Sequence, residues 1–431
     1  MKRAVVIGAG MVGLACGWHL QERGYEVTIL ERGADVAEGS SWGNAGWLSP
    51  ALAIPLNEPS LVTSGLLSLV RSDSPLYVPL RLDPELWRFL ALFASQCTAG
   101  AFREMMDKLA ILNARALEAF DALSPAVEEP TVSAPILAGF RDRREAEGLL
   151  GEFELIQSAG GELHYDLIEG KAAQDRSPLF SPAIGCVIDI HDQRYLNPNR
   201  YTHALADSLR ARGATFMMEK EVTQLRGTGR EVQVRTRDAV EPIRADVAVV
   251  ATGAWANRLA RGLGVRIPVR AGRGYSMICD TQEPATTPIY LPTVRVACTP
   301  IDGGLRVAGT MEFRRPDDPL DPQRLEAITR STRDLLAGID IDHAHDRWVG
   351  PRPVSADGLP LIGPTTQPGV YLAAGHGMWG VTQGPITGQL LAQAIDSGEV
   401  PPELRPFDPL RAMQWPQVPR IAKWPRLGSK S

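Results

Sequence analysis

The sequence predicts an α/β fold built on a buried parallel sheet, combined with a second, sheet-rich α+β part. Two observations predict the parallel sheet. The β-branched run at 3–7 leads through closely spaced glycines into a helical pattern and then into a second apolar run at 26–30, which is the order of a strand–helix–strand unit. A third apolar run, at 245–253, ends in small residues and returns the chain to the same sheet.

The composition of the 431 residues fits a folded globular protein. Apolar residues make up 44% and charged residues 22%, which excludes a disordered chain. The 45 basic and 50 acidic residues give a net charge of −5, so no basic excess is available to bind nucleic acid. No apolar run approaches the roughly 18 residues of a membrane-spanning helix, and none is expected.

The cysteines and the first residues of the chain indicate the cellular compartment in which the protein is expected. The five cysteines are far apart and form no C-x-x-C pair, so neither a zinc site nor a disulfide framework is expected, and a reducing, cytoplasmic location fits better. Residues 1–20 resemble a signal peptide, because two basic residues precede an apolar run. We reject that interpretation because the glycines fall where a nucleotide-binding turn needs them.

The first glycine motif predicts a dinucleotide-binding turn. Gly8 permits the tight turn, Gly10 lets the backbone approach a pyrophosphate, and Gly13 lets the helix pack on the strand. The helix N-terminus offers free N–H groups and a partial positive charge to the phosphates. Glu31, at the end of the second strand, can accept hydrogen bonds from a ribose. A purely structural glycine-rich turn is the alternative, and the motif does not distinguish a nicotinamide from a flavin.

Several later segments extend this unit. The small, polar loop at 40–46 suits close approach to a large ligand, although a surface turn has the same composition. A helix is expected at 197–212, strands at 214–237, and a hairpin at 295–311. A nucleotide-binding sheet that is interrupted and then resumed suits a cofactor that extends through most of the molecule.

The segment near the C-terminus is the most informative. A strand at 370–374 leads into the glycine-rich turn 375–380 and a long helix at about 381–395. Since a phosphate site is already present at residue 8, we assign this second helix N-terminus to charge that develops during reaction. A reduced flavin carries such a charge near its N1 and O2 edge, which a helix N-terminus would stabilise.

These motifs together resemble the D-amino acid oxidase superfamily of FAD-dependent oxidoreductases, along nearly the whole chain. The anchors are GAGMVG at 8–13, SSWGNAGWLSP at 40–50, VVATGAWA at 249–256, and the two segments GPRPVSADGLPLIGP and AAGHGMWGVTQGP within 350–385. The resemblance implies non-covalent FAD, an FAD-binding Rossmann-like domain with a mixed-sheet substrate domain, and oxidation of an amino acid at its α carbon.

The resemblance also implies which residues bind the cofactor. They would hold the ADP half, line the pyrophosphate and flavin ring, touch adenine and surround the isoalloxazine edge. They are Gly8, Gly10, Met11, Val12, Gly13, Glu31, Arg32, Ser41, Asn44, Ala45, Gly46, Val222, Gly253, Trp255, Gly377, Met378, Gly380, Val381 and Thr382.

Two residues are predicted to be catalytic. Arg352 aligns with an arginine that binds the substrate carboxylate, a task that suits the guanidinium fork; a structural salt bridge is the alternative. His376 could polarise the flavin or the substrate, or serve as a backbone spacer. The substrate pocket departs from the relatives, because the stretch 293–299 offers Arg295 and no tyrosine, and Met378 stands where glycine oxidase has a basic residue.

The function implied is FAD-dependent oxidative deamination of a D-amino acid or cyclic secondary amino acid. Hydride would pass from Cα to flavin N5, and the imine would hydrolyse to a 2-oxo acid. Alternatives are the catalytic subunit of an opine or D-hydroxyproline dehydrogenase, a glycine or sarcosine oxidase-like enzyme, and a non-catalytic electron-relay flavoprotein subunit. Oxygen, a quinone or a partner subunit would accept the electrons.

The FAD-binding domain is expected to be discontinuous, at 1–60, 192–265 and 345–431. The substrate-binding domain is expected at 61–191 and 266–344.

Three further segments carry weaker expectations. The acidic and histidine residues at 342–346 are interpreted as a polar connection, so no metal is expected. The apolar stretches 61–70 and 86–93 indicate core or subunit contacts, with peripheral contact to the inner face of a membrane, or a hetero-oligomer, left open. Arg273 and Tyr275 are interpreted as solvated surface residues, with a place at the active-site entrance as the alternative.

Overall fold

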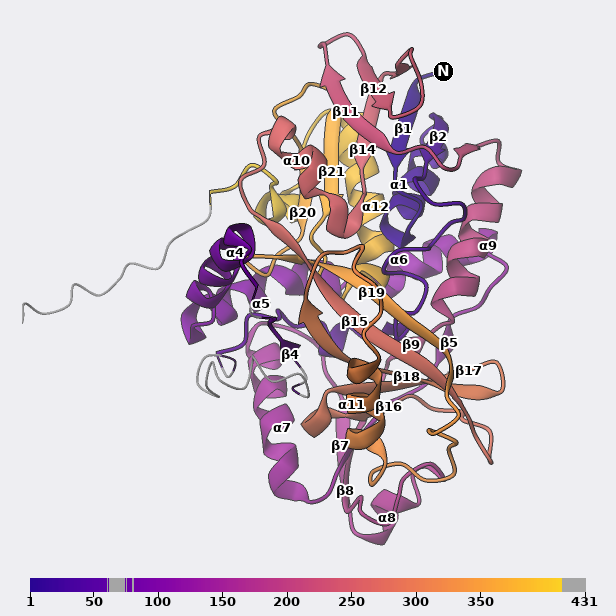
Figure 1. Cartoon of the computed structure of the whole chain (residues 1–431), viewed down its shortest axis with the longest axis vertical. Helices are drawn as coiled ribbons and strands as arrows, with labels where there is room; N and C mark the ends of the chain where they lie inside the picture. The colour runs from indigo at the N-terminus through magenta and orange to yellow at the C-terminus, as the bar shows by residue number, and fades with distance from the viewer. Residues whose placement is uncertain (60, 62–73, 75, 80, 413–431) are drawn as a thin grey trace, which may run out of the picture.

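The strand–helix–strand unit at the start of the chain forms the centre of a six-stranded sheet (Figure 1). The computed structural model describes residues 1–59, 61, 74, 76–79 and 81–412. In spatial order the strands of this first sheet are β10 (Thr215–Met217), β2 (Glu26–Leu30), β1 (Arg3–Ile7), β14 (Val247–Val250), β21 (Val370–Ala374) and β20 (Leu361–Pro364). All neighbours run parallel except β20 and β21. The predicted parallel sheet is therefore confirmed.

Both faces of the first sheet are covered, which explains why its strands are continuously apolar. Ala4 and Val6 of β1 face one core, and Val5 and Ile7 face another. The helices α1 (Met11–Glu22), α9 (Pro198–Ala211) and α12 (Gly380–Ser397) cover the first face. The strands β11 (Val222–Gly227), β12 (Val232–Thr236) and β13 (Ile243–Ala245), with the short helix α10 (Asn257–Ala260), cover the second.

The second sheet is mixed, as predicted. In spatial order it contains β19 (His345–Ser355), β15 (Val269–Asp280), β18 (Gly304–Phe313), β17 (Val296–Ile301), β16 (Ile289–Leu291), β6 (Ile136–Phe140), β8 (Cys186–Ile190) and β7 (Tyr165–Glu169), while β4 (Leu76–Tyr77) pairs with β18. The pairs β16–β6 and β18–β4 are parallel and the others antiparallel. Strands β17 and β18 form the predicted hairpin.

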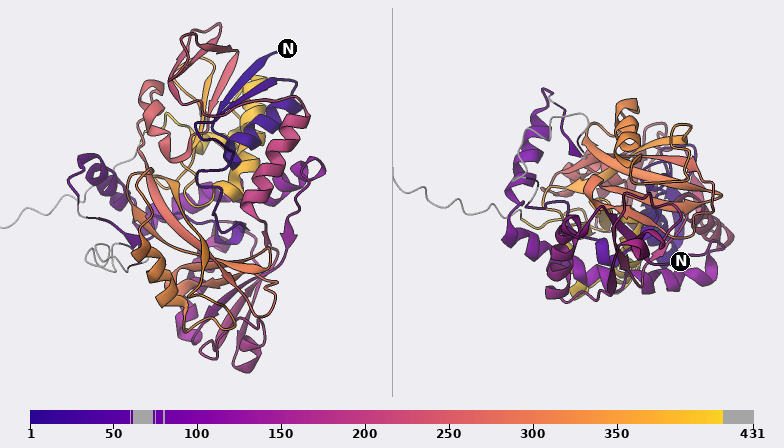
Figure 2. Two further views of the ribbon diagram at one scale, coloured as in Figure 1. Left: turned by 45° about the vertical axis from the view of Figure 1, so that its right-hand side comes forward. Right: turned by 90° about the horizontal axis from the view of Figure 1, so that it is seen from below.

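Helices cover the second sheet as well. The helices α8 (Lys171–Gln174) and α11 (Pro322–Thr332) pack on one face, and α7 (Arg143–Ser158) packs on the other. The long strands β15, β18 and β19 lie between the first sheet and the lower part of the molecule (Figures 1 and 2).

The remaining elements connect the two sheets. The helices α5 (Ala99–Asn113) and α6 (Ala116–Leu123) pack against α12, and α4 (Pro84–Ser95) packs its aromatic side chains on Phe313. A small sheet contains β3 (Trp47–Leu48), β9 (Arg194–Tyr195) and β5 (Val132–Ser133). The 3-10 helices are η1 (Pro50–Leu52), η2 (Ser124–Ala126), η3 (Gly253–Trp255), η4 (Arg261–Leu263), η5 (Pro292–Val294) and η6 (Pro402–Phe407).

Of the two apolar stretches expected to form core or subunit contacts, 61–70 and 86–93, the structure describes only the second in full. Residues 86–93 form part of α4, with Phe89 and Phe93 buried, which is the expected core contact. Residues 62–70 lie outside the described part of the chain. Within the described ranges, no helix is long and apolar enough to cross a bilayer.

The strand β19 is an edge strand of the second sheet. Residues 345–355 pair along β15, with Val269 opposite Ser355 and Gly272 opposite Arg352. The chain returns to the first sheet only at β20. Pro351 and Pro353 hid this strand in the sequence, because proline is tolerated only at a sheet edge, and β19 occupies that edge. The division into two domains stays a prediction.

The interpretation of Arg273 and Tyr275 as solvated residues is wrong. Both lie in β15 between two neighbouring strands, and their exposed fractions are 1% and 0%. The Tyr275 hydroxyl donates a 2.6 Å hydrogen bond to Glu312, and the Arg273 guanidinium lies 3.5 Å from the same carboxylate. A buried arginine is tolerated here because a buried carboxylate compensates its charge.

Candidate active site

The first glycine turn requires glycine at two positions, at one for its backbone conformation and at the other for lack of space. Gly8 has φ +108°, and a Cβ there would lie 2.5 Å from the carbonyl oxygen of Ala251. A Cβ on Gly13 would overlap the carbonyl oxygen of Gly8. Gly10 is the N-cap of α1 and has no side chain to cap it. The turn therefore brings the N-terminus of α1 to the carboxyl end of β1 without a side-chain N-cap, and the Met11 N–H donates to the Ser41 hydroxyl at 3.1 Å.

The acidic residue predicted to bind the ribose is held at this turn. The two carboxylate oxygens of Glu31 accept hydrogen bonds from the backbone N–H groups of Ala9 and Gly33, each at 2.8 Å. Each oxygen keeps a second lone pair for a ligand hydroxyl.

A cavity of about 450 Å³ begins at this turn and ends at the second sheet. It lies at the carboxyl ends of β1, β14 and β21, where ligands bind in open α/β sheets. The predicted residues that line it are Gly8, Gly10, Met11, Val12, Glu31, Arg32, Ser41, Asn44, Val222, Gly253, Trp255, Arg352, His376, Gly377, Met378, Gly380 and Val381.

Four of the predicted cofactor residues are not among the cavity's lining residues. Gly13 lies behind the turn, against Gly8. Ala45 and Gly46 are engaged by their own neighbourhood, because the Ala45 carbonyl accepts from Thr299, and a Cβ on Gly46 would overlap the Leu196 carbonyl oxygen. The hydroxyl of Thr382 is buried and donates to the Trp47 carbonyl at 2.9 Å. These four residues therefore contact other parts of the protein and do not line the cavity.

The cavity also contains residues that sequence reasoning missed. Thr252 is one of them, and its buried hydroxyl has no hydrogen-bond partner within the described chain. Most of the others directly flank predicted motifs, which is the signal that could have found them. They are Ile7, Leu30, Gly33, Ala37, Glu38, Gly39, Ser40, Lys220, Glu221, Ala251, Thr252, Arg258, Leu259, Pro353, Ala373 and Ala374.

The second glycine turn also lines the cavity and joins the two sheets there. Gly375 and Gly377 have φ angles of +77° and +57°, which suit glycine. The N–H of Gly377 donates to the Pro353 carbonyl at 2.8 Å, so the turn is fastened to β19. The helix α12 follows, and its N-cap Trp379 makes no side-chain cap. A second bare helix N-terminus therefore faces the cavity.

Arg352 reaches this end of the cavity from β19. Its guanidinium lies directly over Gly274 of β15, in the space that a Cβ there would occupy. It has no hydrogen bond or ion pair with any residue that the structure describes. Burial lowers the pKa of Arg352 to about 10, so the group stays cationic at neutral pH. The structural salt bridge considered from the sequence is not present among the described residues.

His376 lies beside Arg352 but faces the protein interior. Its Nε2 lies 3.0 Å from the hydroxyl of Thr387 in α12. Burial lowers the pKa of His376 to about 4, so the ring is neutral at neutral pH. This contact favours a role in holding the turn; the predicted catalytic role stays a prediction.

The histidine-rich segment at 342–346 makes only pairwise contacts. His343 pairs with Asp340 at 2.9 Å, and His345 lies 3.5 Å from Asp280. Among the residues with described positions, no group of three His, Cys, Asp or Glu side chains is arranged to hold a metal ion.

Comparison with known proteins defines the class. The model of the FAD-dependent oxidoreductase family matches residues 3–394, so the chain belongs to this family, and the resemblance seen in the sequence is confirmed. Two relatives, both called D-amino acid dehydrogenase, come from Vibrio vulnificus (strain YJ016) and Xanthobacter autotrophicus (strain ATCC BAA-1158 / Py2). They are 28% identical over 399 residues and 29% identical over 404 residues, and each match covers 91% of this chain and 95% of the relative.

Solved structures share the fold. Glycine oxidase from Geobacillus kaustophilus has a TM-score of 0.69 at 21% identity, covering 96% of this chain and 100% of that one. L-α-glycerophosphate oxidase from Mycoplasma pneumoniae with FAD bound has a TM-score of 0.70 at 16% identity, covering 92% of this chain and 95% of that one.

The chain is therefore an FAD-dependent oxidoreductase, and its cavity fits the cofactor. One end has a glycine cradle, a bare helix N-terminus and a fixed carboxylate, as an ADP group needs. The orphaned hydroxyl of Thr252 provides a further polar contact along the cavity. The N-terminus of α12 faces the same cavity beside that of α1 and would lie against the flavin ring.

Proposed function

We propose that this enzyme oxidises the Cα–N bond of an amino acid, with D-amino acids as substrates. Bound FAD would supply the two-electron oxidation, the amino acid would leave as its imine, and water would hydrolyse the imine to a 2-oxo acid and ammonia. Two observations support this reaction: the relatives named D-amino acid dehydrogenase match along nearly their whole length, and a cationic side chain lies free at the flavin end of the cavity.

The observation that carries the proposal is the unpaired guanidinium of Arg352. A partly buried cation without a partner is unfavourable unless a ligand supplies the opposite charge. A carboxylate matches the guanidinium in charge and in its two-pronged shape, and the resulting pair of hydrogen bonds would fix the orientation of Cα. Arg352 would therefore bind the substrate, while His376 and Thr387 hold the adjacent turn.

The reaction is tested by reducing the purified yellow protein without oxygen. Panels of D-amino acids, L-amino acids, cyclic secondary amines and carboxyalkyl amines are added, and bleaching of the flavin absorbance identifies substrates. We expect bleaching by D-amino acids; bleaching by none of the panel would overturn the proposal, and bleaching only by secondary amines would favour the opine or D-hydroxyproline alternative. Readmitting air, or a quinone, identifies which of these accepts the electrons; failure of both would favour a partner subunit.

Replacement of Arg352 by lysine separates substrate binding from cofactor binding. A lysine keeps the charge but makes only point contacts, and losing a charge-assisted hydrogen bond costs about 1.5–3 kcal/mol. We expect KM to rise roughly ten- to a hundredfold, while the visible spectrum and the FAD content stay unchanged.

The pH profile gives a second measurement on Arg352. The cation is the binding form, so kcat/KM of the wild type should fall as the pH rises through about 10, and this limb should move in Arg352→Lys. The control is Arg270→Lys, because Arg270 lies on the adjacent strand and pairs with Asp83 and Glu85. A wild-type KM in Arg352→Lys would remove Arg352 from the site.

A further inference from the structure

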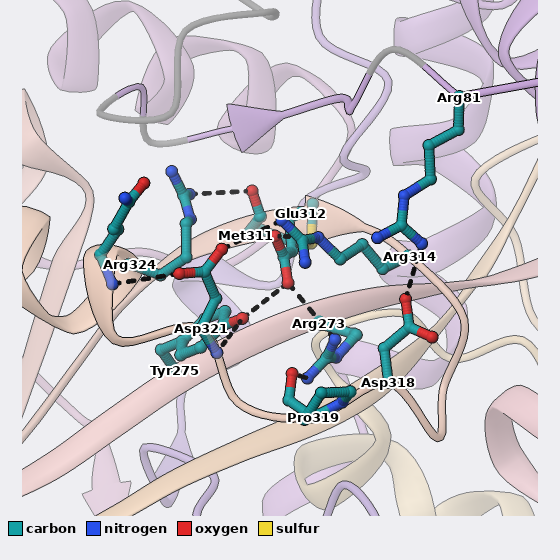
Figure 3. Close-up of polar contacts among 11 residues, drawn as sticks. Arg81, Arg273, Tyr275, Met311, Glu312, Arg314, Asp318, Pro319, Asp321 and Arg324 are labelled. Atoms are coloured by element: carbon teal, nitrogen blue, oxygen red, sulfur yellow. Dashed lines mark hydrogen bonds and ion pairs between the residues drawn. The ribbon is translucent and has the colours of Figure 1, made fainter.

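The loop 314–321 joins β18 to α11 and extends from the second sheet to the cofactor cavity. Its two ends are fastened by a buried polar network (Figure 3). At the first end, the Arg314 Nε lies 2.9 Å from Glu312, a carboxylate with no exposed surface. At the second end, Asp321 pairs with Arg314 at 3.0 Å, and its N–H donates to the Tyr275 hydroxyl at 3.4 Å. The loop is therefore closed on itself at its base.

The middle of the loop is fastened at two more points. Arg273, buried beneath the loop, donates to the Pro319 carbonyl at 2.9 Å, and Arg81 pairs with Asp318 at 2.9 Å (Figure 3). A buried charge network of this kind fixes geometry, because each partner would be left uncompensated by any movement. The network is buried at Arg273 and Glu312 and partly exposed at Arg81, and it holds the base and middle of the loop below Asp317, at the tip.

Asp317 contacts three side chains that follow strands of the first sheet: Arg32 after β2, and Trp255 and Arg258 after β14. Its Oδ1 accepts from Arg32 at 3.1 Å and from the indole N–H of Trp255 at 2.9 Å, and its Oδ2 accepts from Arg258 at 2.8 Å. All three donors line the cofactor cavity, at the end that contains Glu31 and Val222. One carboxylate thus holds three cavity side chains that come from two separate segments of the chain.

Arg32 and Trp255 also stack on each other. The guanidinium carbon lies 3.7 Å from the centroid of the indole ring, which is a cation–π contact. Asp317 accepts a hydrogen bond from each of these two groups, so one carboxylate holds both members of the stacked pair. Partial burial raises the pKa of Asp317, whereas the hydrogen bonds from Arg32 and Trp255 lower it. The lowering is the larger effect, so the pKa of Asp317 lies below its usual value.

We propose that Asp317 is a positioning residue for the adenosine half of FAD, and that the loop 314–321 clasps this end of the cofactor site from the second sheet. Asp317 orders the long side chains of Arg32 and Arg258 before the cofactor arrives, so that less conformational entropy is lost on binding.

The size of the effect follows from exposure. The side chain of Asp317 is 49% exposed and that of Arg32 is 37% exposed, and exposed ion pairs are individually weak. Three contacts on one carboxylate act together, so we expect a moderate effect, a rise of about three- to tenfold in the FAD dissociation constant on removal of the charge.

The test compares Asp317→Asn with Asp318→Asn. The neighbouring carboxylate Asp318 belongs to the same loop but contacts Arg81 and not the cavity, so it reports any general loosening of the loop. The FAD dissociation constant is measured from the return of flavin fluorescence on dilution of the holoenzyme. The ADP dissociation constant is measured by letting ADP compete with FAD for the flavin-free protein. Asp317→Asn is expected to weaken FAD and ADP by the same factor, with unchanged KM for the amino acid at saturating FAD.

Asp317→Glu, which keeps the charge, is expected to restore most of the affinity, and Asp318→Asn to retain it. Unchanged FAD and ADP binding in Asp317→Asn would overturn the proposal, as would an equal loss in Asp318→Asn. A loss for FAD without a loss for ADP would also overturn it, because the effect would then lie at the flavin. These measurements need no substrate, so they stand apart from the proposed amino-acid oxidation.

Discussion

Gly274 and Arg352 are adjacent on neighbouring strands, and the missing side chain of one makes room for the other. The guanidinium covers the Cα of Gly274, and Gly272 lies opposite Arg352 in the ladder between β15 and β19. Since the guanidinium is the far end of a flexible side chain, a methyl group at Gly274 would displace it without moving the backbone.

Replacement of Gly274 by alanine should therefore impair substrate binding more than folding. We expect KM for the amino acid to rise at least tenfold, which corresponds to about 1.4 kcal/mol, while the melting temperature stays near that of the wild type. Steady-state kinetics and thermal melts of the holoenzyme provide the measurement. A wild-type KM would show that the position of the guanidinium over Gly274 does not matter for binding.

Single residues were predictable where a local pattern or a motif marked them. Gly8 and Glu31 are marked by the strand, turn and helix around them, and Arg352 by the resemblance. Asp317 was not predictable, because nothing in the sequence connects residue 317 with Arg32. Only the fold brings these two residues within hydrogen-bond distance.

Among the elements, α1 and α12 pack closely against each other beside the cofactor site. A Cβ on Gly388 would lie 2.5 Å from the carbonyl carbon and 2.6 Å from the carbonyl oxygen of Ala15, which are backbone atoms of α1. The two helices bring neighbouring N-termini to the same cavity, since a Cβ on Gly380 would lie 3.9 Å from the Val12 side chain. Their separation thus affects the part of the cofactor site that both N-termini face.

Gly388→Ala should push these helices apart. Overpacking against backbone costs about 1–3 kcal/mol, and we expect a lower melting temperature together with weaker FAD binding. The matched control is Gly148→Ala in α7, where a Cβ would meet nothing within 4 Å and the helix should gain about 0.5–1 kcal/mol. Equal melting temperatures for the two variants would contradict the packing argument.

Most elements could be predicted because their own residues carry the periodicity. The strand at 26–30 has the predicted bounds, and the helix expected at 197–212 spans Pro198–Ala211. The strand β19 was missed as part of the second sheet, since two prolines mask its pattern and its pairing depends on a strand some 80 residues earlier. Long-range pairing is decided by tertiary contacts that local sequence does not encode.

At the scale of the whole molecule, the loop 40–46 lies between the two sheets and joins them. Three side chains of the second sheet donate to its carbonyl groups. Ser276 donates to Gly43 at 3.0 Å and Thr299 to Ala45 at 2.6 Å, while Arg306 donates to both Trp42 and Asn44, at 3.0 and 3.2 Å. The loop also contributes Ser40, Ser41 and Asn44 to the cavity, so the second sheet holds a wall of the cofactor site.

Arg306 makes the largest contribution to this junction. Its exposed fraction is 4%, and burial lowers the pKa of its guanidinium, so its charge is tolerated only because the two carbonyls and Asp346 face it. Replacing a buried ion by an apolar residue can be neutral when all its partners are also removed. Here the carbonyls of Trp42 and Asn44 would remain, unsatisfied.

Arg306→Met should therefore destabilise the protein by about 1–3 kcal/mol and loosen the loop at the cofactor site. We expect the FAD dissociation constant to rise by at least tenfold, and Arg306→Lys, which keeps the charge but has fewer donors, to lie in between. The exposed Arg333→Met, which removes only a surface pair with Asp342, should match the wild type in both measurements. If Arg306→Met bound FAD as tightly as the wild type, the second sheet would not be holding the loop 40–46 in its binding position. The cofactor site would then be complete without these contacts from the second sheet.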